Sequence, residues 1–146
     1  MKMRSLLALA GLVFGFTWLG VGQEQNTTDP EVRQQIEAAT MKLGEAINKH
    51  DAAAVAALYT QDATQVWSFL AEGGVTSGQQ AIEKRYAVEF ASSPGEFAAK
   101  LVQVYPVGSE ISAIAEKSWG RWKDYIAWIY ARDADTWKIR MEYVTK

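Results

Sequence analysis

The stretch DYIAWIYAR, residues 124–132, decides the fold because it is apolar on both of its faces. Successive residues of a β-strand point to opposite sides. One side carries Ile126, Trp128 and Tyr130, and the other carries Tyr125, Ala127, Ile129 and Ala131. A strand with two apolar sides is covered on both of them. We therefore expect the body of the domain on one side and another molecule on the other.

Three further strands flank this one, at residues 96–106, 110–118 and 136–144, with turn signals at VGS, around WGRWKD and at DAD. The sequence leaves open whether the middle turn lies on Gly120 or on Lys123 and Asp124. The last strand alternates. Trp137, Ile139, Met141 and Tyr143 face one way, and Lys138, Arg140 and Glu142 face the other. These features predict a four-strand meander.

Helices are predicted before the meander. Asp29 followed by Pro30 is typical of a helix start. An apolar stripe continues that helix to about Lys49, formed by Val32, Ile36, Ala39, Leu43 and Ile47. Asp51 can cap a second helix at residues 52–60, and a third is predicted at 78–90. Short strands are expected at residues 64–69 and 75–77.

Helices followed by antiparallel strands are typical of the α+β class. We expect a cone-like, curved antiparallel sheet wrapped on the long N-terminal helix, with two further helices. Such a sheet would leave a cavity at its open end.

The first 22 residues are predicted to be a secretory signal peptide, because basic MKMR precedes the apolar run SLLALAGLVFGFTWLGVG. Small residues at Gly20 and Gly22 predict cleavage near Gly22 and export to the periplasm or beyond. Residues 23–28 form a polar tether, and 29–146 form a single domain. The alternative is an uncleaved membrane anchor, since the apolar run is just long enough to span a bilayer.

Composition disfavours several classes of function. The net charge is −2, and loss of Lys2 and Arg4 with the signal peptide lowers it to −4, so nucleic-acid binding has no electrostatic support. His50 is the single histidine, there is no cysteine, and no carboxylate pair has ligand spacing. We therefore expect neither a metal nor a cofactor.

Three segments carry a resemblance to a known family: INKHDAAAVAALYTQDAT (47–64), SGQQAIEKRY (77–86) and DTWKIRMEY (135–143). They resemble the nuclear transport factor 2-like superfamily, with the SnoaL-like and ketosteroid isomerase-like branches nearest. The resemblance implies a cystatin-like cone with a deep apolar pocket, paired into a homodimer through the sheet. It is specific for the fold and weak for function, because this fold hosts many activities.

The ketosteroid isomerases present a proton-shuttling aspartate from the strand that follows a DAT-like segment. In this chain DATQVW (62–67) places Trp67 at or beside that position. An indole N–H only donates hydrogen bonds, so Trp67 is predicted to be a wall of the pocket. The family's first-helix tyrosine has no counterpart in residues 30–49, and no buried acid is evident on the later strands. We therefore assign no catalytic residue.

The predicted pocket lining consists of aromatic residues whose hydroxyl and indole groups supply polar handles. These residues are Tyr59, Trp67, Tyr86, Phe90, Trp128 and Tyr143. The leading interpretation is an exported protein that binds a small apolar or aromatic molecule. The alternatives are an isomerase, cyclase or dehydratase acting on a small apolar carbonyl or polyketide-like substrate, with Tyr59 or Tyr86 as acid, and a structural dimerisation module.

The contents of the cavity distinguish these interpretations. An open cavity with a carboxylate or histidine in reach of a ligand favours the enzyme. A dry, open aromatic cavity favours the binder, and a filled one favours the module.

Overall fold

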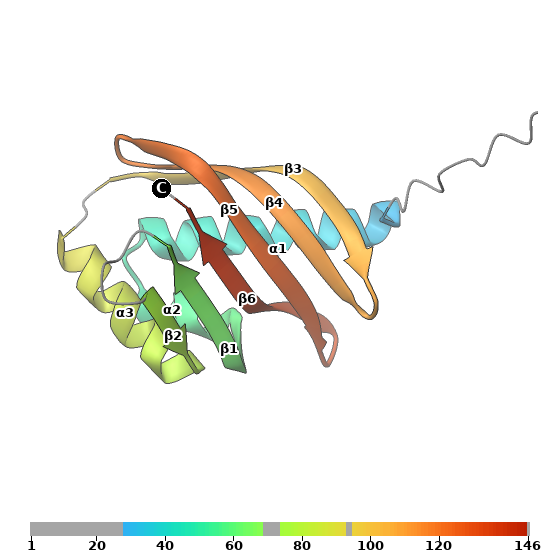
Figure 1. Cartoon of the computed structure of the whole chain (residues 1–146), viewed down its shortest axis with the longest axis horizontal. Coiled ribbons are helices and arrows are strands. Elements are labelled where there is room, and N and C mark those ends of the chain that lie inside the picture. The colour runs from blue at the N-terminus through green and yellow to red at the C-terminus, as the bar shows by residue number, and fades with distance from the viewer. Residues whose placement is uncertain (1–27, 69–73, 93–94, 146) are drawn as a thin grey trace, which may run out of the picture.

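The computed structural model describes residues 28–68, 74–92 and 95–145 (Figure 1). The predicted signal peptide and tether residues 23–27 lie outside this part of the chain. The elements, in chain order, are α1 Pro30–Asn48, α2 Ala52–Ala57, β1 Tyr59–Trp67, β2 Gly74–Ser77, α3 Gln79–Ser92, β3 Phe97–Val107, β4 Glu110–Trp119, β5 Trp122–Asp133 and β6 Thr136–Val144. None of the helices in these three ranges is long and apolar enough to cross a membrane.

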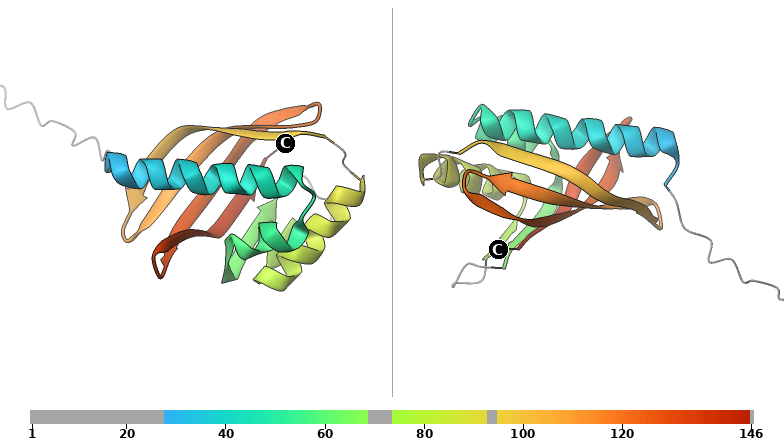
Figure 2. Two further views of the ribbon diagram at one scale, coloured as in Figure 1. Left: turned by 180° about the vertical axis from the view of Figure 1, so that it is seen from behind. Right: turned by 90° about the horizontal axis from the view of Figure 1, so that it is seen from above.

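The strands form one curved sheet in the order β2-β1-β6-β5-β4-β3, which confirms the α+β class. Helix α1 lies across one face of the sheet, and α2 and α3 lie beside β1 and β2 (Figure 2). The expectation of a purely antiparallel sheet is wrong, because β1 and β6 run parallel. The chain leaves β1 through β2, α3 and the meander, and it returns beside β1 in the same direction.

Helix α1 begins as the sequence predicts. The Asp29 carboxylate accepts a hydrogen bond from the Glu31 backbone N–H at 2.8 Å, and Pro30 occupies the first helical position. The buried stripe of this helix consists of Ile36, Thr40, Leu43, Ala46 and Ile47. This stripe packs against the inner face of the sheet and forms the core with the side chains of β4, β5 and β6.

The second helix is shorter than predicted. It ends at Ala57, and Tyr59 is already the first residue of β1, paired with Ile139 of β6. The Leu58 carbonyl also accepts from the Ile139 N–H at 2.9 Å. Pairing with β6 therefore overrides the helical pattern at this point, and it turns the Tyr59 side chain into the core, where it is completely buried.

A β-bulge in β6 reverses the predicted direction of its last residues. Tyr130 pairs with Ile139 while Ile129 pairs with Met141, so Arg140 is an extra residue. Beyond the bulge, Met141 and Tyr143 point to the outer side of the sheet. Glu142 and Val144 point inward and are buried, with Glu142 0% exposed. The prediction that Glu142 faces away from the core is wrong for this reason.

The middle turn of the meander lies on Gly120, whose φ of 57° suits glycine. Trp119 and Trp122 flank it as a cross-strand pair. The Gly120 N–H donates to the Glu96 carbonyl at 3.0 Å, and a Cβ on Gly95 would lie 2.5 Å from the Gly120 Cα. This close backbone contact fixes the β4–β5 turn, and with it Trp119, against the start of β3.

Candidate functional site

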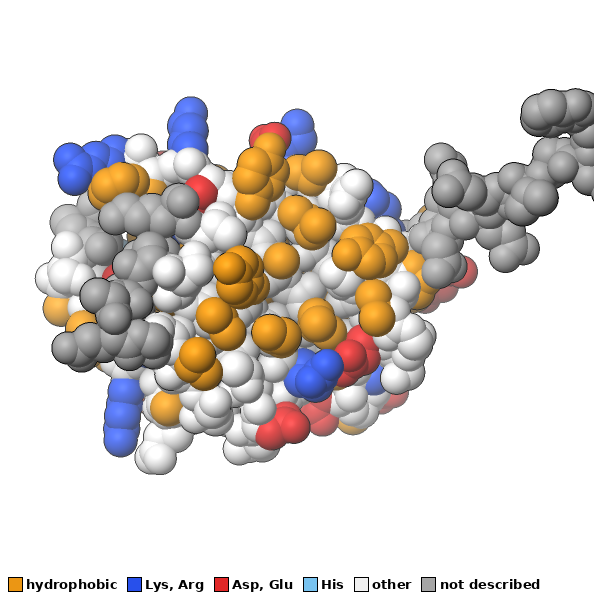
Figure 3. All heavy atoms as spheres, in the orientation of Figure 1, with side chains coloured by type: hydrophobic (Ala, Val, Ile, Leu, Met, Phe, Trp, Pro, Cys, Tyr) orange, Lys and Arg blue, Asp and Glu red, His pale blue; other side chains and the backbone are white. Residues whose placement is uncertain are grey.

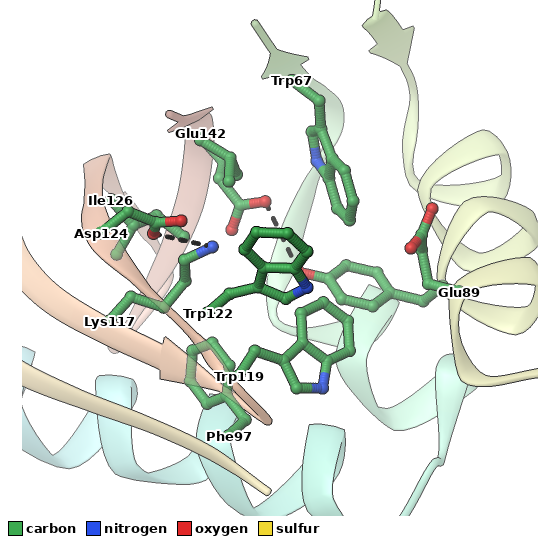
Figure 4. A pocket seen from close by; sticks show the side chains of 11 residues that line it. Trp67, Glu89, Phe97, Lys117, Trp119, Trp122, Asp124, Ile126 and Glu142 are labelled. Atoms are coloured by element: carbon green, nitrogen blue, oxygen red, sulfur yellow. Dashed lines mark hydrogen bonds and ion pairs between the residues drawn. The ribbon is translucent and has the colours of Figure 1, made fainter. Parts of the chain in front are cut away.

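A cavity of about 130 Å³ lies between the inner face of the sheet and α3 (Figure 4). Its lining is mainly aromatic and apolar, and we call it the aromatic cavity. The lining residues are Trp67, Tyr86, Glu89, Phe97, Lys117, Trp119, Trp122, Asp124, Ile126, Glu142 and Val144. Trp122 is 47% exposed, so the cavity meets solvent beside this ring.

The polar centre of the cavity is the buried carboxylate of Glu142. Its Oε2 accepts from the Tyr59 hydroxyl at 2.7 Å and from the Trp128 indole N–H at 2.8 Å. Its Oε1 accepts from the Gln65 amide at 2.6 Å and from the Tyr86 hydroxyl at 3.5 Å. An ionised carboxylate only accepts hydrogen bonds and has about four positions for donors. All of these positions are therefore in use.

The bond from Tyr86 is the weakest of the four, because 3.5 Å is at the outer limit for a hydrogen bond. The Tyr86 hydroxyl also lies 3.2 Å from that of Tyr59. Tyr86 lines the cavity while Tyr59 lies behind it. A ligand could therefore take the Tyr86 hydroxyl as a donor without disturbing the three shorter bonds to Glu142.

Two ion pairs adjoin the cavity. Lys117 Nζ lies 3.0 Å from Asp124 Oδ1, and both side chains are largely buried. Arg85 Nε lies 3.4 Å from Glu89 Oε1, and the Arg85 guanidinium stacks on the Trp67 ring at 4.5 Å from its centroid. Glu142, by contrast, has no cationic partner within 4.0 Å among residues 28–68, 74–92 and 95–145.

The residues predicted to line the pocket differ in where they lie relative to the aromatic cavity. Trp67 and Tyr86 line the cavity. Tyr59 and Trp128 lie behind it and donate to Glu142, and the Tyr59 hydroxyl also contacts that of Tyr86. Phe90 is a support, with its ring 5.6 Å from that of Tyr86. Tyr143 lies on the outer side of the sheet, 41% exposed, because the bulge at Arg140 reverses its direction, so its prediction as a pocket residue is wrong.

Most of the remaining lining residues were not predicted from the sequence. Trp119 and Trp122 could have been predicted once the turn was placed on Gly120, because they then become a cross-strand pair beside it. Glu142 gave no such signal, since its alternation with Met141 and Tyr143 predicted the opposite side.

Among the described residues, neither His50 nor a cluster of metal-ligating side chains contributes to the aromatic cavity. His50 is exposed at the α1–α2 junction and stacks on Phe90 at 5.0 Å, away from the cavity lining. Within the described part of the chain, no three histidine, cysteine, aspartate or glutamate side chains gather in a way that could hold a metal ion.

The buried tyrosines predict a loss of stability in alkali. Burial raises the pKa of Tyr59 and Tyr86 well above the ordinary value, and the Glu142 charge raises both further; burial also raises the pKa of Tyr130. Below about pH 10 all three tyrosines are protonated in both the folded and the unfolded chain. Their contribution to the free energy of unfolding is therefore fully present in this range. Above that pH the unfolded chain loses protons that the folded chain retains, and the free energy of unfolding falls, by roughly 4 kcal/mol per pH unit for three groups.

Denaturant unfolding at several pH values between 8 and 11.5 measures this slope. Tyr59→Phe should reduce it by about a third, whereas Tyr125→Phe, at an exposed position, should keep the wild-type slope. A slope that Tyr59→Phe leaves unchanged would contradict the assignment.

Comparison with known proteins supports the fold. No protein-family model and no curated protein matches the chain. Among solved structures, a cystatin-like protein of unknown function from Nostoc punctiforme superposes with a TM-score of 0.69 at 8% identity, over 80% of this chain and 92% of that one. A nuclear transport factor 2-like protein of unknown function from Shewanella oneidensis gives a TM-score of 0.67 at 17% identity, over 79% of this chain and 99% of that one.

A ketosteroid isomerase-like protein from Erwinia carotovora atroseptica gives a TM-score of 0.63 at 18% identity, over 81% of this chain and 98% of that one. The chain therefore has the nuclear transport factor 2-like, or cystatin-like, fold. At these sequence identities the similarity supports the fold alone, and the function has to be argued from the site.

Proposed function

We propose that this chain is an exported small-molecule-binding protein that takes one small apolar or aromatic molecule in the aromatic cavity. The observation that carries the proposal is the cavity itself, with Trp67, Trp119 and Trp122 as walls and the Tyr86 hydroxyl as a polar handle. Apolar walls with a few convergent polar groups are typical of ligand sites. A dry cavity of about 150 Å³ in another protein accommodates benzene, so the volume fits a ligand of about one ring.

Export is part of the proposal and rests on the signal-peptide pattern of residues 1–22. N-terminal sequencing of the protein recovered from producing cells tests it. We expect the mature chain to begin at Gln23. A chain that keeps Met1 and fractionates with membranes would support the uncleaved anchor instead.

The binding proposal is tested by titration with phenol and toluene as single-ring probes, followed by tryptophan fluorescence. Trp67→Ala should weaken binding at least tenfold, because Trp67 is 4% exposed and forms a wall. It should also lower the free energy of unfolding by roughly 3–5 kcal/mol, as truncation of a buried ring does. A variant that kept both its affinity and its melting temperature would show that Trp67 is not a wall.

Trp122→Ala separates the two effects. Trp122 is half exposed at the side where the cavity meets solvent, so its loss should weaken binding with little change in stability. Trp137→Ala is the matched control, because Trp137 packs beside Gln35 of α1, outside the cavity lining. It should leave the affinity for phenol at the wild-type value.

An enzyme is the second candidate, and the carboxylate of Glu142 in the cavity lining favours it. Glu142 or Tyr86 could move a proton next to a small carbonyl. The occupied lone pairs of Glu142 oppose this role, because a general base needs a free position for the proton that it removes. The open volume of the cavity disfavours the third interpretation, a module filled by its own tryptophans.

Deuterium exchange of 2-cyclohexenone in buffered D₂O distinguishes the binder from the enzyme. A proton-transfer enzyme would accelerate exchange next to the carbonyl, and Glu142→Gln would abolish the acceleration. We expect exchange at the buffer rate. Acceleration that Glu142→Gln removes would replace the binding proposal with the enzyme.

A further inference from the structure

The walls of the aromatic cavity meet at steep angles and form a box. The rings of Trp67 and Trp119 lie 6.5 Å apart at 71°, and those of Trp67 and Tyr86 lie 6.4 Å apart at 78°. Phe97 closes the lower side in Figure 4, at 86° to Trp119. Four aromatic rings of different orientation, Trp67, Tyr86, Phe97 and Trp119, therefore line the cavity. Such an arrangement suits a cation, which aromatic faces attract.

Of the charged side chains that line the cavity, Glu142 alone has no ion-pair partner within 4.0 Å among the described residues. Lys117 is paired with Asp124, and Glu89 is paired with Arg85. Glu142 is fully buried and is held by neutral donors alone. In a site of low dielectric constant, a single unpaired carboxylate attracts a cation strongly. The aromatic faces and this carboxylate therefore favour the same kind of ligand.

Two rings that line the cavity already contact an arginine. The Arg121 guanidinium lies over Trp122 at 4.9 Å from the ring centroid. The Arg85 guanidinium lies over Trp67 at 4.5 Å from the ring centroid. Arg85 is itself paired with Glu89, so its charge is balanced locally. This contact shows that the Trp67 ring accepts a cation–π interaction in the folded chain.

We propose that the aromatic cavity selects a small organic cation, with a methylated ammonium group as the part that it encloses. The inference rests on the proposed binding function and names the ligand class for the same cavity. A trimethylammonium group is similar in size to the single ring that the volume of about 130 Å³ admits. Its methyl surface contacts the aromatic faces while its charge is directed toward Glu142.

The test compares choline with 3,3-dimethyl-1-butanol, its neutral carbon counterpart of nearly the same shape, using the mature chain. Tryptophan fluorescence and ligand-observed NMR give the two dissociation constants. We expect choline to bind at least tenfold tighter than the neutral alcohol. Glu142→Gln should remove most of this preference, and Trp119→Leu should weaken choline more than the alcohol.

Glu83→Gln is the matched control for Glu142→Gln, because Glu83 is exposed on α3, and it should keep the wild-type preference. If Glu142→Gln fails to fold, the two probes on the wild-type chain still decide the question. Equal affinity for the two probes would overturn the cation inference and leave the binding proposal standing. No binding of choline, the alcohol or phenol would overturn both.

Discussion

Glu142→Leu is expected to lower the free energy of unfolding by about 2–4 kcal/mol, the largest effect on stability that we expect from removing one polar side chain. The substitution leaves the buried N–H groups of Trp128 and Gln65 without their acceptor, and each unsatisfied group costs about 1–3 kcal/mol. The hydroxyls of Tyr59 and Tyr86 can still pair with each other, since they lie 3.2 Å apart. Relief from burying a charge offsets part of the loss.

Glu142→Gln should be milder, at about 1–2 kcal/mol, because it keeps one acceptor oxygen and the shape of the side chain. The Gln65 Oε1 has no hydrogen-bond partner among the described residues. Rotation of the Gln65 amide can therefore present this oxygen to the new amide group. Thermal and denaturant unfolding of both variants measure the difference.

Glu83→Leu, at an exposed position on α3, is the control and should change the free energy of unfolding by no more than about 0.5 kcal/mol. A Glu142→Leu chain as stable as this control would show that the buried donors find other acceptors.

The main features of the fold were predictable because local chemistry determines them. The Asp29 cap and the stripe from Ile36 to Ile47 fix α1, and the structure confirms both. The strands of the meander follow from turn residues and β-forming runs, and β3 to β6 appear close to their predicted bounds. These signals lie within a few residues of the element that they specify.

The position of Glu142 was not predictable in this way. A bulge is a property of two paired strands, and the extra residue at Arg140 becomes visible only when Ile129 and Tyr130 are aligned with β6. Because the side-chain period of a strand is 2, one extra residue moves every later side chain to the other face. The same event brought Glu142 into the cavity and removed Tyr143 from it.

The predicted boundary between α2 and β1 was wrong for a related reason. Leu58 and Tyr59 continue the apolar helical pattern of residues 52–57. In the structure, however, their backbone is hydrogen-bonded to and paired with the parallel strand β6. Pairing between segments that lie 80 residues apart leaves no trace in either local pattern. The candidate site depends on this long-range pairing and on the bulge between the neighbouring strands β5 and β6. Most of its polar centre was therefore not predictable from the local sequence pattern.

Substitution of both Tyr125 and Ile129 by aspartate is expected to convert a homodimer of the mature chain into monomers. We propose the dimer because the outer side of the sheet is apolar and uncovered by the three helices, which lie at its other face and at its end (Figure 2). The outer sheet face comprises Val66, Ile114, Tyr125, Ala127, Ile129, Met141 and Tyr143. Hydrophobic side chains gather over these strands in Figure 3.

Strand pairing makes this surface continuous. Ile114 lies opposite Ala127, Ala127 lies opposite Tyr143, and Tyr143 lies opposite Val66, so the apolar row crosses β4, β5, β6 and β1. Tyr125, 54% exposed, adds a large ring at one side. Monomers rarely expose a contiguous patch of this kind. A second copy packed sheet against sheet covers it with closed two-fold symmetry, the commonest arrangement of oligomers.

Light scattering on residues 23–146 at micromolar concentration measures the outcome. The wild-type chain should give the mass of two chains, and the double aspartate variant the mass of one, because an unpaired charge buried in an apolar interface costs several kcal/mol. Val88→Asp, at an exposed position on α3, is the control and should remain dimeric. A wild-type mass near one chain would exclude the dimer. A dimer that survives both aspartates would place its interface elsewhere on the molecule.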